Sequence, residues 1–332
     1  MFDANTLAII FIALMGLSVI LYAVLDGYDL GVGILLPLEH DQHSDRMVAS
    51  IGPFWDANET WLVLAVGLLL IAFPSAHSLI LRELYLPTAI LLISLVLRGV
   101  AFDFRAKAPF SHKPTWNRVF KIGSLLAALS QGYMLGMYVM GFEESWAAVG
   151  FSLLSALGVA AAYTFIGACW LIMKTEGVLQ KRAVGWAKKA VGLCIVGTFA
   201  VSVVNPWINP TVYGRWLSWP NVLYLAPLPI LCMLLFAFNY RALSKLPASG
   251  DRGCWIPFVS AVAIFLLCFF GLAVSFFPYI VPGQLTIWDA AAAPESLTII
   301  LWGAIVVVPI ILCYTAFAYR VFWGKVDELK YY

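Results

Sequence analysis

The sequence predicts an all-α polytopic membrane protein with about nine transmembrane helices, and three observations carry this prediction. Hydrophobic residues make up 62% of the 332 residues and charged residues only 11%, with a mean hydropathy of +0.90. Several stretches reach about 20 apolar residues, the length that crosses a bilayer as an α-helix. No connection between them exceeds about twenty residues, too few for a soluble domain. We therefore expect residues 1–332 to form a single integral membrane domain.

Hydropathy along the chain places the nine spans one by one. They are expected at about residues 7–36, 57–75, 79–104, 119–140, 147–173, 186–205, 220–241, 256–279 and 298–322. The N-terminus has no basic region and no small-residue cleavage site, so we expect the first span to stay in the membrane. Gly27, Gly31 and Gly33 near its end are expected to loosen the helix, or to let another backbone approach closely.

Charge in the connections predicts the orientation. One basic connection contains Arg105, Lys107, Lys113, Arg118 and Lys121, and another contains Lys174, Lys181, Arg182, Lys188 and Lys189. Connections on the other side carry Glu143, Glu144, Asp289 and Glu295. Basic connections stay in the cytoplasm, so nine spans place the N-terminus in the periplasm and the C-terminus in the cytoplasm. The net charge of +2 therefore reflects topology and does not indicate nucleic-acid binding.

A related five-residue pattern ends the third, seventh and ninth spans, at residues 101–105, 237–241 and 316–320. Each copy combines aromatic residues with a final arginine. We interpret the pattern as an interface anchor, in which the aromatic rings lie at headgroup depth and the arginine extends to water. The repeat is too short to establish a duplicated fold.

Residues able to hold a metal or haem are sparse. The six cysteines show no C-x-x-C spacing, which argues against zinc and iron–sulfur sites. His40, His43, His77 and His112 all lie in or near connections, whereas haem in a membrane bundle usually needs His or Met ligands at depth. A lone methionine such as Met134 fits packing better. We expect no haem to be bound by this chain alone, and no metal.

Ionisable residues nevertheless occur within the first three spans. They are Asp26 and Asp29 in the first, Asp56 and Glu59 at the start of the second, and Arg98 and Asp103 in the third. Such a group costs roughly 2.5–3.5 kcal/mol at the membrane centre, so it should face a partner or a watery cavity. With the N-terminus outside, Asp26 follows about 20 helical residues, or about 30 Å. All three helices therefore gather their ionisable groups near the cytoplasmic face.

Two roles remain open for these groups. Asp26 and Asp29 are three residues apart and share a helix face, as do Asp56 and Glu59. Crowded, buried carboxyl groups suit proton transfer near neutrality, and Gln131 in the fourth span could extend a polar path. In a structural role, an arginine would neutralise one acid while the others, such as Asp56, cap helix ends. For the cluster as a whole we favour proton conduction, because buried ionisable groups in membranes are functional by default.

Three ordered motifs resemble subunit II of cytochrome bd-type quinol oxidases. They are the segments 26–33 (DGYDLGVG), 52–61 (GPFWDANETW) and 98–105 (RGVAFDFR). The length and the nine-span layout fit the family over essentially the whole chain. The form Trp-Asp-Ala-Asn-Glu-Thr-Trp at 55–61 is similar to the cyanide-insensitive branch.

The resemblance implies a respiratory complex of the bacterial inner membrane that oxidises quinol, reduces oxygen to water and translocates protons. It implies a haem-bearing subunit I with haems b and d, against which subunit II packs. The implied fold is two four-helix bundles plus one peripheral helix. A cytoplasmic proton path is expected between the subunits, with Asp56 on it and Asp29 and Asp26 nearby. Some members hold a structural quinone, which the sequence does not place, and a small single-span subunit is compatible with the family.

Two alternatives belong to other classes. In an ion-coupled secondary transporter, the same acids would bind a coupling ion near discontinuous helices. Their position toward one membrane face, away from the midplane, argues against that. In a purely structural assembly subunit the acids would be inert.

Overall fold

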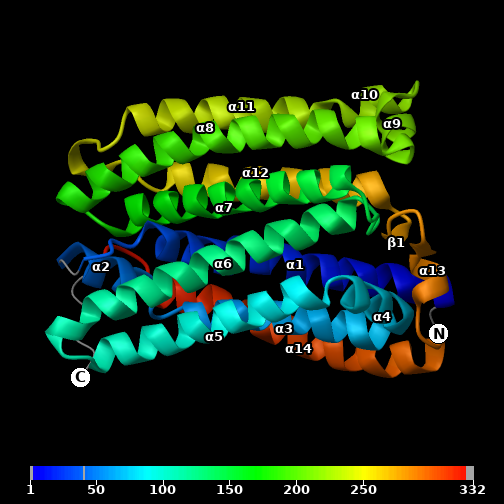
Figure 1. Ribbon diagram of the computed structural model, residues 1–332, viewed down its shortest axis with the longest axis horizontal. Coiled ribbons are helices and arrows are strands. Elements are labelled where there is room, and N and C mark those ends of the chain that lie inside the picture. Colours follow the sequence, from blue (N-terminus) through cyan, green and yellow to red (C-terminus); the bar gives the residue numbers. More distant parts are fainter. Residues whose placement is uncertain (1–2, 40–41, 327–332) are drawn as a thin grey trace.

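The computed structural model describes residues 3–39 and 42–326. Within these ranges nine helices are long and apolar enough to cross a membrane, which confirms the predicted number. They are α1 (Ala4–Leu35), α3 (Trp55–Ala72), α5 (Tyr85–Lys107), α6 (Lys113–Val139), α7 (Trp146–Lys174), α8 (Gly177–Ile208), α11 (Pro227–Ser244), α12 (Ile256–Phe276) and α14 (Pro294–Val321). Successive spans run in opposite directions, so α1 begins at one end of the molecule and α14 finishes at the other (Figure 1).

Short elements lie at the two ends of the spans. They are α2 (Gln42–Ile51), α4 (Pro74–Glu83), η1 (Phe110–His112), α9 (Pro210–Leu217), α10 (Asn221–Leu225), η2 (Ser249–Asp251) and α13 (Ile287–Ala290), with the strands β1 (Tyr279–Val281) and β2 (Leu285–Thr286). The two strands pair antiparallel. Helix α2 lies at the end where α1 finishes, while α4, α9, α10 and α13 lie at the opposite end (Figure 1).

Prolines correct two of the predicted boundaries. The third span was expected to begin at residue 79, but the helix breaks at Leu84 and the span begins at Tyr85. Pro87 explains the break, because its ring would clash with the carbonyl of Glu83 in a continuous helix. Pro229 acts in the same way on Leu225 and separates α10 from α11.

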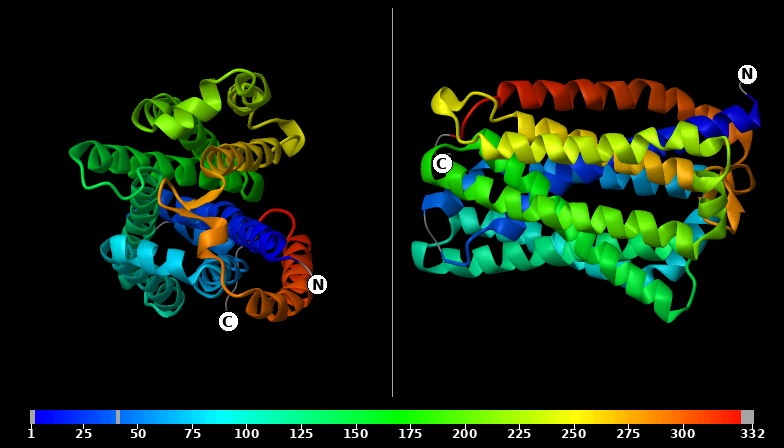
Figure 2. Two further views of the ribbon diagram at one scale, coloured as in Figure 1. Left: turned by 90° about the vertical axis from the view of Figure 1, so that its right-hand side faces the viewer. Right: turned by 90° about the horizontal axis from the view of Figure 1, so that it is seen from above.

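The spans form two bundles of four helices and one outer helix. Helices α1, α3, α5 and α6 pack together, and α7, α8, α11 and α12 form the second group. Helix α14 lies at the outer edge beside α1 (Figure 2, left). The fold implied by the resemblance, two four-helix bundles and a peripheral helix, is therefore present.

The two bundles meet where α1 crosses α7 without side chains between them. A Cβ added at Gly31 would lie 1.8 Å from the carbonyl oxygen of Tyr163, and one added at Gly167 would lie 2.6 Å from the backbone of Gly31. Only glycine permits this approach. Helix α1 is unbroken from Ala4 to Leu35, so the prediction that its glycines loosen the helix is wrong and the alternative, close packing, holds.

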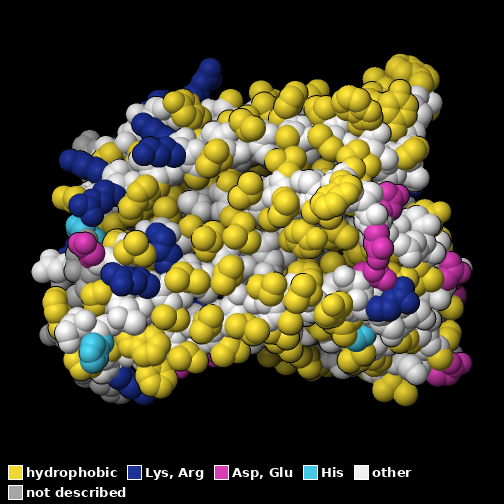
Figure 3. All heavy atoms as spheres, in the orientation of Figure 1, with side chains coloured by type: hydrophobic (Ala, Val, Ile, Leu, Met, Phe, Trp, Pro, Cys, Tyr) yellow, Lys and Arg dark blue, Asp and Glu magenta, His cyan; other side chains and the backbone are white. Residues whose placement is uncertain are grey.

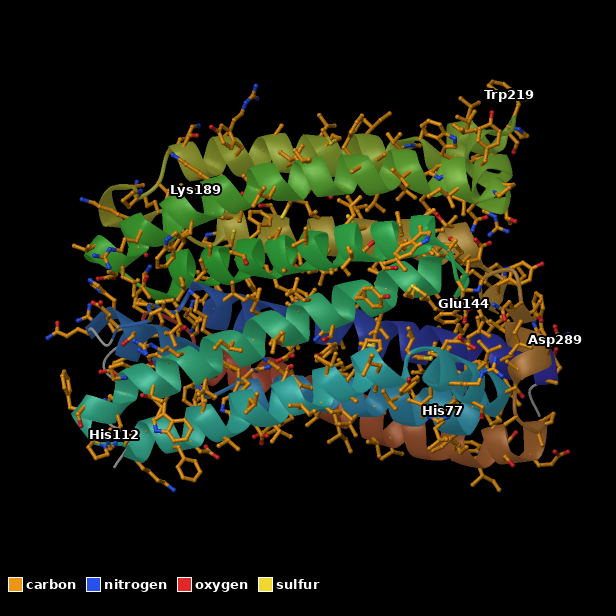
Figure 4. The ribbon with its side chains drawn as sticks, viewed as in Figure 1. His77, His112, Glu144, Lys189, Trp219 and Asp289 are labelled. Carbon is orange, nitrogen blue, oxygen red and sulfur yellow. The ribbon has the colours of Figure 1, made fainter. Side chains whose placement is uncertain are left out.

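Charge divides between the two ends of the molecule. Lysine and arginine side chains gather at the end that carries α2, and acidic side chains gather at the opposite end (Figure 3). His112 and Lys189 mark the first end, whereas Glu144 and Asp289 mark the second (Figure 4).

The arginine of the first five-residue pattern does not behave as an interface anchor. Arg105 is 4% exposed, and it donates to Asn117 Oδ1 at 2.6 Å and to Asp45 Oδ1 at 2.8 Å. A buried guanidinium needs acceptors for its N–H groups. Arg105 finds them on α6 and α2, and so links α5 to both helices. Phe104, next to it, is exposed as an anchor should be. Arg241 and Arg320 in the other two copies are exposed as expected.

Candidate functional site: a buried charge cluster

An ion-paired cluster joins α1, α3 and α5 inside the first bundle. Arg98 Nη1 lies 2.6 Å from Asp26 Oδ1 and 3.0 Å from Glu59 Oε1. The side chains of Arg98 and Asp26 are fully buried, and that of Glu59 is 24% exposed. A buried pair of this kind is tolerated only with close geometry, since taking either charge out of water is costly.

Neighbouring helices enclose the arginine on two sides. Helix α6 approaches α5 closely, since a Cβ added at Gly123 would lie 2.9 Å from Ser94 O and 3.2 Å from Arg98 N. The ring of Trp55, at the start of α3, lies 5.8 Å from the guanidinium carbon of Arg98, within the range of a cation–π interaction. The cluster is therefore shielded from lipid by elements of the first bundle.

The cluster keeps unused hydrogen-bonding capacity. Asp26 Oδ2, Arg98 Nε and Arg98 Nη2 are buried and have no hydrogen-bond partner among the described residues. Native proteins rarely leave buried polar atoms unsatisfied without a reason such as catalysis or bound water. These atoms therefore keep hydrogen-bonding capacity that the described residues do not use.

Asp29, one turn after Asp26 on α1, belongs to a second network. Its Oδ2 accepts a hydrogen bond from Asn58 Nδ2 at 2.7 Å, while its Oδ1 has no partner among the described residues. The hydroxyls of Tyr28 and Tyr319 lie 2.6 Å apart, and Tyr319 donates to Asn58 Oδ1 at 3.3 Å. The network thus links α1, α3 and α14.

Two of the predicted site residues lie apart from these networks. Asp56 and Asp103 are exposed, and no hydrogen bond or ion pair joins either of them to another described residue. Asp56 is in the first turn of α3 but is not its cap, because Phe54 occupies the N-cap position. The prediction that Asp56 could cap this helix is therefore wrong.

Gln131 connects two tyrosines between the bundles. Its Nε2 donates to Tyr22 Oη at 2.7 Å, and its Oε1 accepts from Tyr163 Oη at 2.7 Å. Tyr22 lies on α1 one turn before Asp26, so the amide stands close to the charge cluster. Both readings of Gln131 apply to this geometry, since it bonds neighbouring helices and extends the polar region.

Comparison with known proteins decides the family. Residues 7–322 match cytochrome bd terminal oxidase subunit II. The chain belongs to this family. It is 29% identical to the cytochrome bd-I ubiquinol oxidase subunit 2 of Escherichia coli K12, over 99% of this chain and 97% of the relative. It is 27% identical to the cytochrome bd ubiquinol oxidase subunit 2 of Bacillus subtilis 168, over 92% of each.

A solved structure supports the same fold. The bd oxidase of Geobacillus thermodenitrificans contains a chain that superposes with a TM-score of 0.80, covering 96% of this chain and 98% of that one at 18% identity. As a subunit II, the chain is a multi-pass membrane component of a multi-subunit, haem-containing oxidoreductase of the respiratory chain. The relatives named here are described as oxidase subunits and none as a transporter.

The histidines that the structure describes lie near the ends of the spans. His43 lies on α2, His77 on α4 and His112 on η1, all at the ends of the molecule, and His40 lies outside the described residues. Met134 Sδ accepts a hydrogen bond from Thr88 Oγ1 at 3.5 Å. The described residues contain no group of three or more His, Cys, Asp or Glu side chains that could hold a metal. That haem is held elsewhere in the complex stays a prediction.

Sequence reasoning found the charged members of the site but not their polar partners. It brought Asp26, Glu59 and Arg98 together, as the structure does. It missed Asn58, although this residue lies inside the recognised motif between Asp56 and Glu59. It also missed Tyr319, because the local sequence does not indicate that this residue contacts Tyr28, which lies 291 positions earlier.

Proposed function

We propose that this subunit II conducts protons from the cytoplasmic face to the haem-bearing subunit I of a quinol-oxidising, oxygen-reducing bd-type complex. The path would use Asp56, Glu59, Asp26 and Asp29, with Arg98 as the charge partner. Quinol oxidation and the haems b and d belong to the partner subunit in this proposal. The printed names of the relatives in Escherichia coli and Bacillus subtilis, as ubiquinol oxidase subunits, support the assignment of the complex.

One observation carries the proposal: exposure falls stepwise along the acids. Asp56 is exposed, the side chain of Glu59, one turn further, is 24% exposed, and that of Asp26 is fully buried. Arg98 touches the last two, so a proton passing from Glu59 to Asp26 stays beside the same guanidinium. A row of carboxyl groups that leads inward from a surface suits stepwise proton transfer.

The arginine would keep two acids together without fixing the proton on either one. A single guanidinium offers several donors in one plane, and here the same nitrogen faces both carboxylates. The total charge of Arg98, Asp26 and Glu59 is negative when both acids are ionised. Taking up one proton would therefore neutralise the cluster, which lowers the cost of that step in a medium of low dielectric constant.

The direction of the path follows from the charged ends. Helix α3 begins at the end where the lysine and arginine side chains gather (Figures 1 and 3), and basic connections stay in the cytoplasm. Asp56 would therefore face the cytoplasm, with the N-terminus in the periplasm and the C-terminus in the cytoplasm. The exposed positions of Asp56 and Asp103 suit a surface that subunit I covers.

A pair of matched variants tests the proposal. In Asp56→Asn the amide keeps the size of the side chain and its ability to form hydrogen bonds but cannot release a proton, so oxygen consumption per assembled haem should fall about 100-fold or more where this step limits the rate. Asp103→Asn makes the same change at the other exposed acid and should retain most activity. Normal turnover per haem in Asp56→Asn would exclude its role. Loss of haem in proportion to activity would show a structural role instead.

A further inference from the structure

Asn58 is a fully buried amide placed between three helices. It is 1% exposed. Its Nδ2 lies 2.7 Å from Asp29 Oδ2, 3.0 Å from Tyr28 Oη and 3.3 Å from the carbonyl oxygen of Leu25. Its Oδ1 lies 3.3 Å from the hydroxyl of Tyr319 on α14. The amide therefore has a partner on each side.

The chemistry of these partners fixes the direction of every hydrogen bond. The carbonyl of Leu25 can only accept, so the NH₂ group of Asn58 must face it. Asp29 Oδ2 lies beside the same NH₂ group and therefore accepts from it. The amide oxygen then faces Tyr319, which must donate to it. Since a phenol has one hydrogen, the short contact between the two tyrosines leaves Tyr28 as donor and Tyr319 as acceptor. The chain runs from Tyr28 to Tyr319, then to Asn58, and ends at Asp29.

We propose that Asn58 and Tyr319 are positioning residues for Asp29, which hold its Oδ2 as a hydrogen-bond acceptor and leave Oδ1 as the atom that exchanges the proton. This inference rests on the proposed function, because it takes Asp29 to lie on the proton path. Asp29 Oδ1 is buried and has no hydrogen-bond partner among the described residues, which is the state of an atom left free for exchange. Without Tyr319 the amide oxygen of Asn58 would lose its donor, and the amide would be held only from the side of its NH₂ group.

The peripheral helix thereby takes part in the site. Tyr319 stacks on Phe54 with ring centroids 4.5 Å apart, and Tyr28 stacks on Trp170 at 4.1 Å. These contacts fix both rings, so each hydroxyl is held where its hydrogen bond is made.

Apart from Tyr28 and Tyr319, the ionisable groups acting on Asp29 are Asp26 on α1, Glu59 on α3 and Arg98 on α5.

The test compares two variants that each remove one phenolic hydroxyl from the same network. Tyr319→Phe keeps the ring that stacks on Phe54 but removes the donor to Asn58. Tyr28→Phe keeps the ring that stacks on Trp170 and leaves the bond from Tyr319 to Asn58 in place. It removes one acceptor of Asn58 Nδ2, which keeps Asp29 Oδ2 and the carbonyl of Leu25. Both are assembled with the complete complex, and oxygen consumption per haem is measured between pH 5 and pH 9. The carboxyl infrared band that disappears in Asp29→Asn serves as a second readout.

The proposed direction of the hydrogen bonds predicts unequal results. Tyr319→Phe should lower oxygen consumption about two- to tenfold, the usual effect of one hydrogen bond. It should also move the pH of half-maximal activity upward by about half a unit or more, because Asn58 is then held less firmly as the donor to Asp29, and a carboxyl group with a weaker donor ionises less readily. The Asp29 band should shift as well. Tyr28→Phe should change each value much less.

Each contrary outcome has a distinct meaning. Equal effects of the two variants, or an unchanged pH profile in Tyr319→Phe, would overturn the positioning role. Normal oxygen consumption in Asp29→Asn would instead remove Asp29 from the proton path, and so contradict that part of the proposed function. A loss of haem in Tyr319→Phe with no change in the pH profile would mean that Tyr319 only anchors α14.

Discussion

At the scale of single residues, Arg98 holds the most consequential position in the chain. It has two acidic partners, is fully buried, and has nitrogens that are not hydrogen bonded to any described residue. Breaking a buried ion pair usually costs about 3–5 kcal/mol, because the remaining charge is left without compensation. This cost is comparable with the whole stability margin of many proteins.

Arg98→Leu should therefore prevent stable assembly, as Asp26 and Glu59 would be left buried without a cation. The measurement is the amount of haem-loaded complex in the membrane. The double variant Arg98→Leu with Asp26→Leu removes both charges of the shorter pair, and it should recover much of the assembled complex. It should still consume little oxygen, because Asp26 is missing from the path. Full assembly of the single variant would show that the ion pair contributes little.

The polar partners of the site show the limit of sequence reasoning at this scale. Charged residues in an apolar stretch stand out because their burial is costly, so Asp26, Glu59 and Arg98 could be predicted. Asparagine and tyrosine are unremarkable in a membrane helix, and their roles depend on which helices are neighbours. Asn58 and Tyr319 are found only when α3 and α14 are seen together.

At the scale of helices, glycine decides how closely α1 and α7 pack. A Cβ at Gly31 would overlap the backbone of α7, and both helices would have to separate. Since α1 carries Asp26 and Asp29, such a movement would also displace the acids from Arg98 and Asn58. The bundle junction and the site therefore depend on the same glycine.

Gly31→Ala is predicted to destabilise the subunit strongly, in the range of about 1–3 kcal/mol typical of overpacking or above. Gly67→Ala is the matched control, because a Cβ there meets nothing within 4 Å. That control should be neutral, or slightly stabilising through its higher helix propensity. The thermal midpoints of the purified complexes provide the comparison. Equal midpoints for both variants would contradict the close packing described here.

The helix starts were predicted well where helix and apolar stretch coincide, and missed where they do not. Helix α8 begins at Gly177 and not at the expected 186, because its first turns are polar and carry Lys181 and Arg182. The spans α7 and α12 begin at Trp146 and Ile256, within a residue of their predicted starts. The prediction failed at α4 and α5, since a hydropathy average does not register that Pro87 excludes a helical residue four positions earlier. The end of α1 was predicted within one residue, at 36 against Leu35. The expected loosening did not occur, because Gly31 serves the close approach of α7.

At the scale of the whole molecule, the separation of charge predicts the topology. A reporter fused after Lys113 should read as cytoplasmic, and one fused after Glu144 as periplasmic, since the two positions lie on opposite sides of α6. Lys113 is the first residue of α6 and Glu144 lies in the connection after it, so fusion at these helix ends should disturb the bundles little. The reverse pair of signals would place the acid cluster near the periplasm and remove the proposed uptake from the cytoplasm.

The overall arrangement could be predicted because it depends on length and composition. Nine apolar stretches and short connections leave few options, and family resemblance supplied the two bundles. The packing of α14 against the bundles could not be predicted in the same way, since it depends on contacts between individual side chains, such as those of Tyr319 with Tyr28 and Asn58. One of them, the bond from Lys174 Nζ to the carbonyl oxygen of Phe322 at 2.5 Å, joins the chain just after α14 to the second bundle.

The central claim is that protons for oxygen reduction pass through the acids of this subunit, and Glu59 is the position where the path leaves the surface. The most direct measurement is the rate of proton uptake after an oxygen pulse, in vesicles containing the assembled complex with Glu59→Gln. The account predicts that proton uptake from the cytoplasmic face and oxygen consumption fall together, by about 100-fold or more, with haem content unchanged. Proton uptake at the normal rate in a fully assembled Glu59→Gln complex would contradict it.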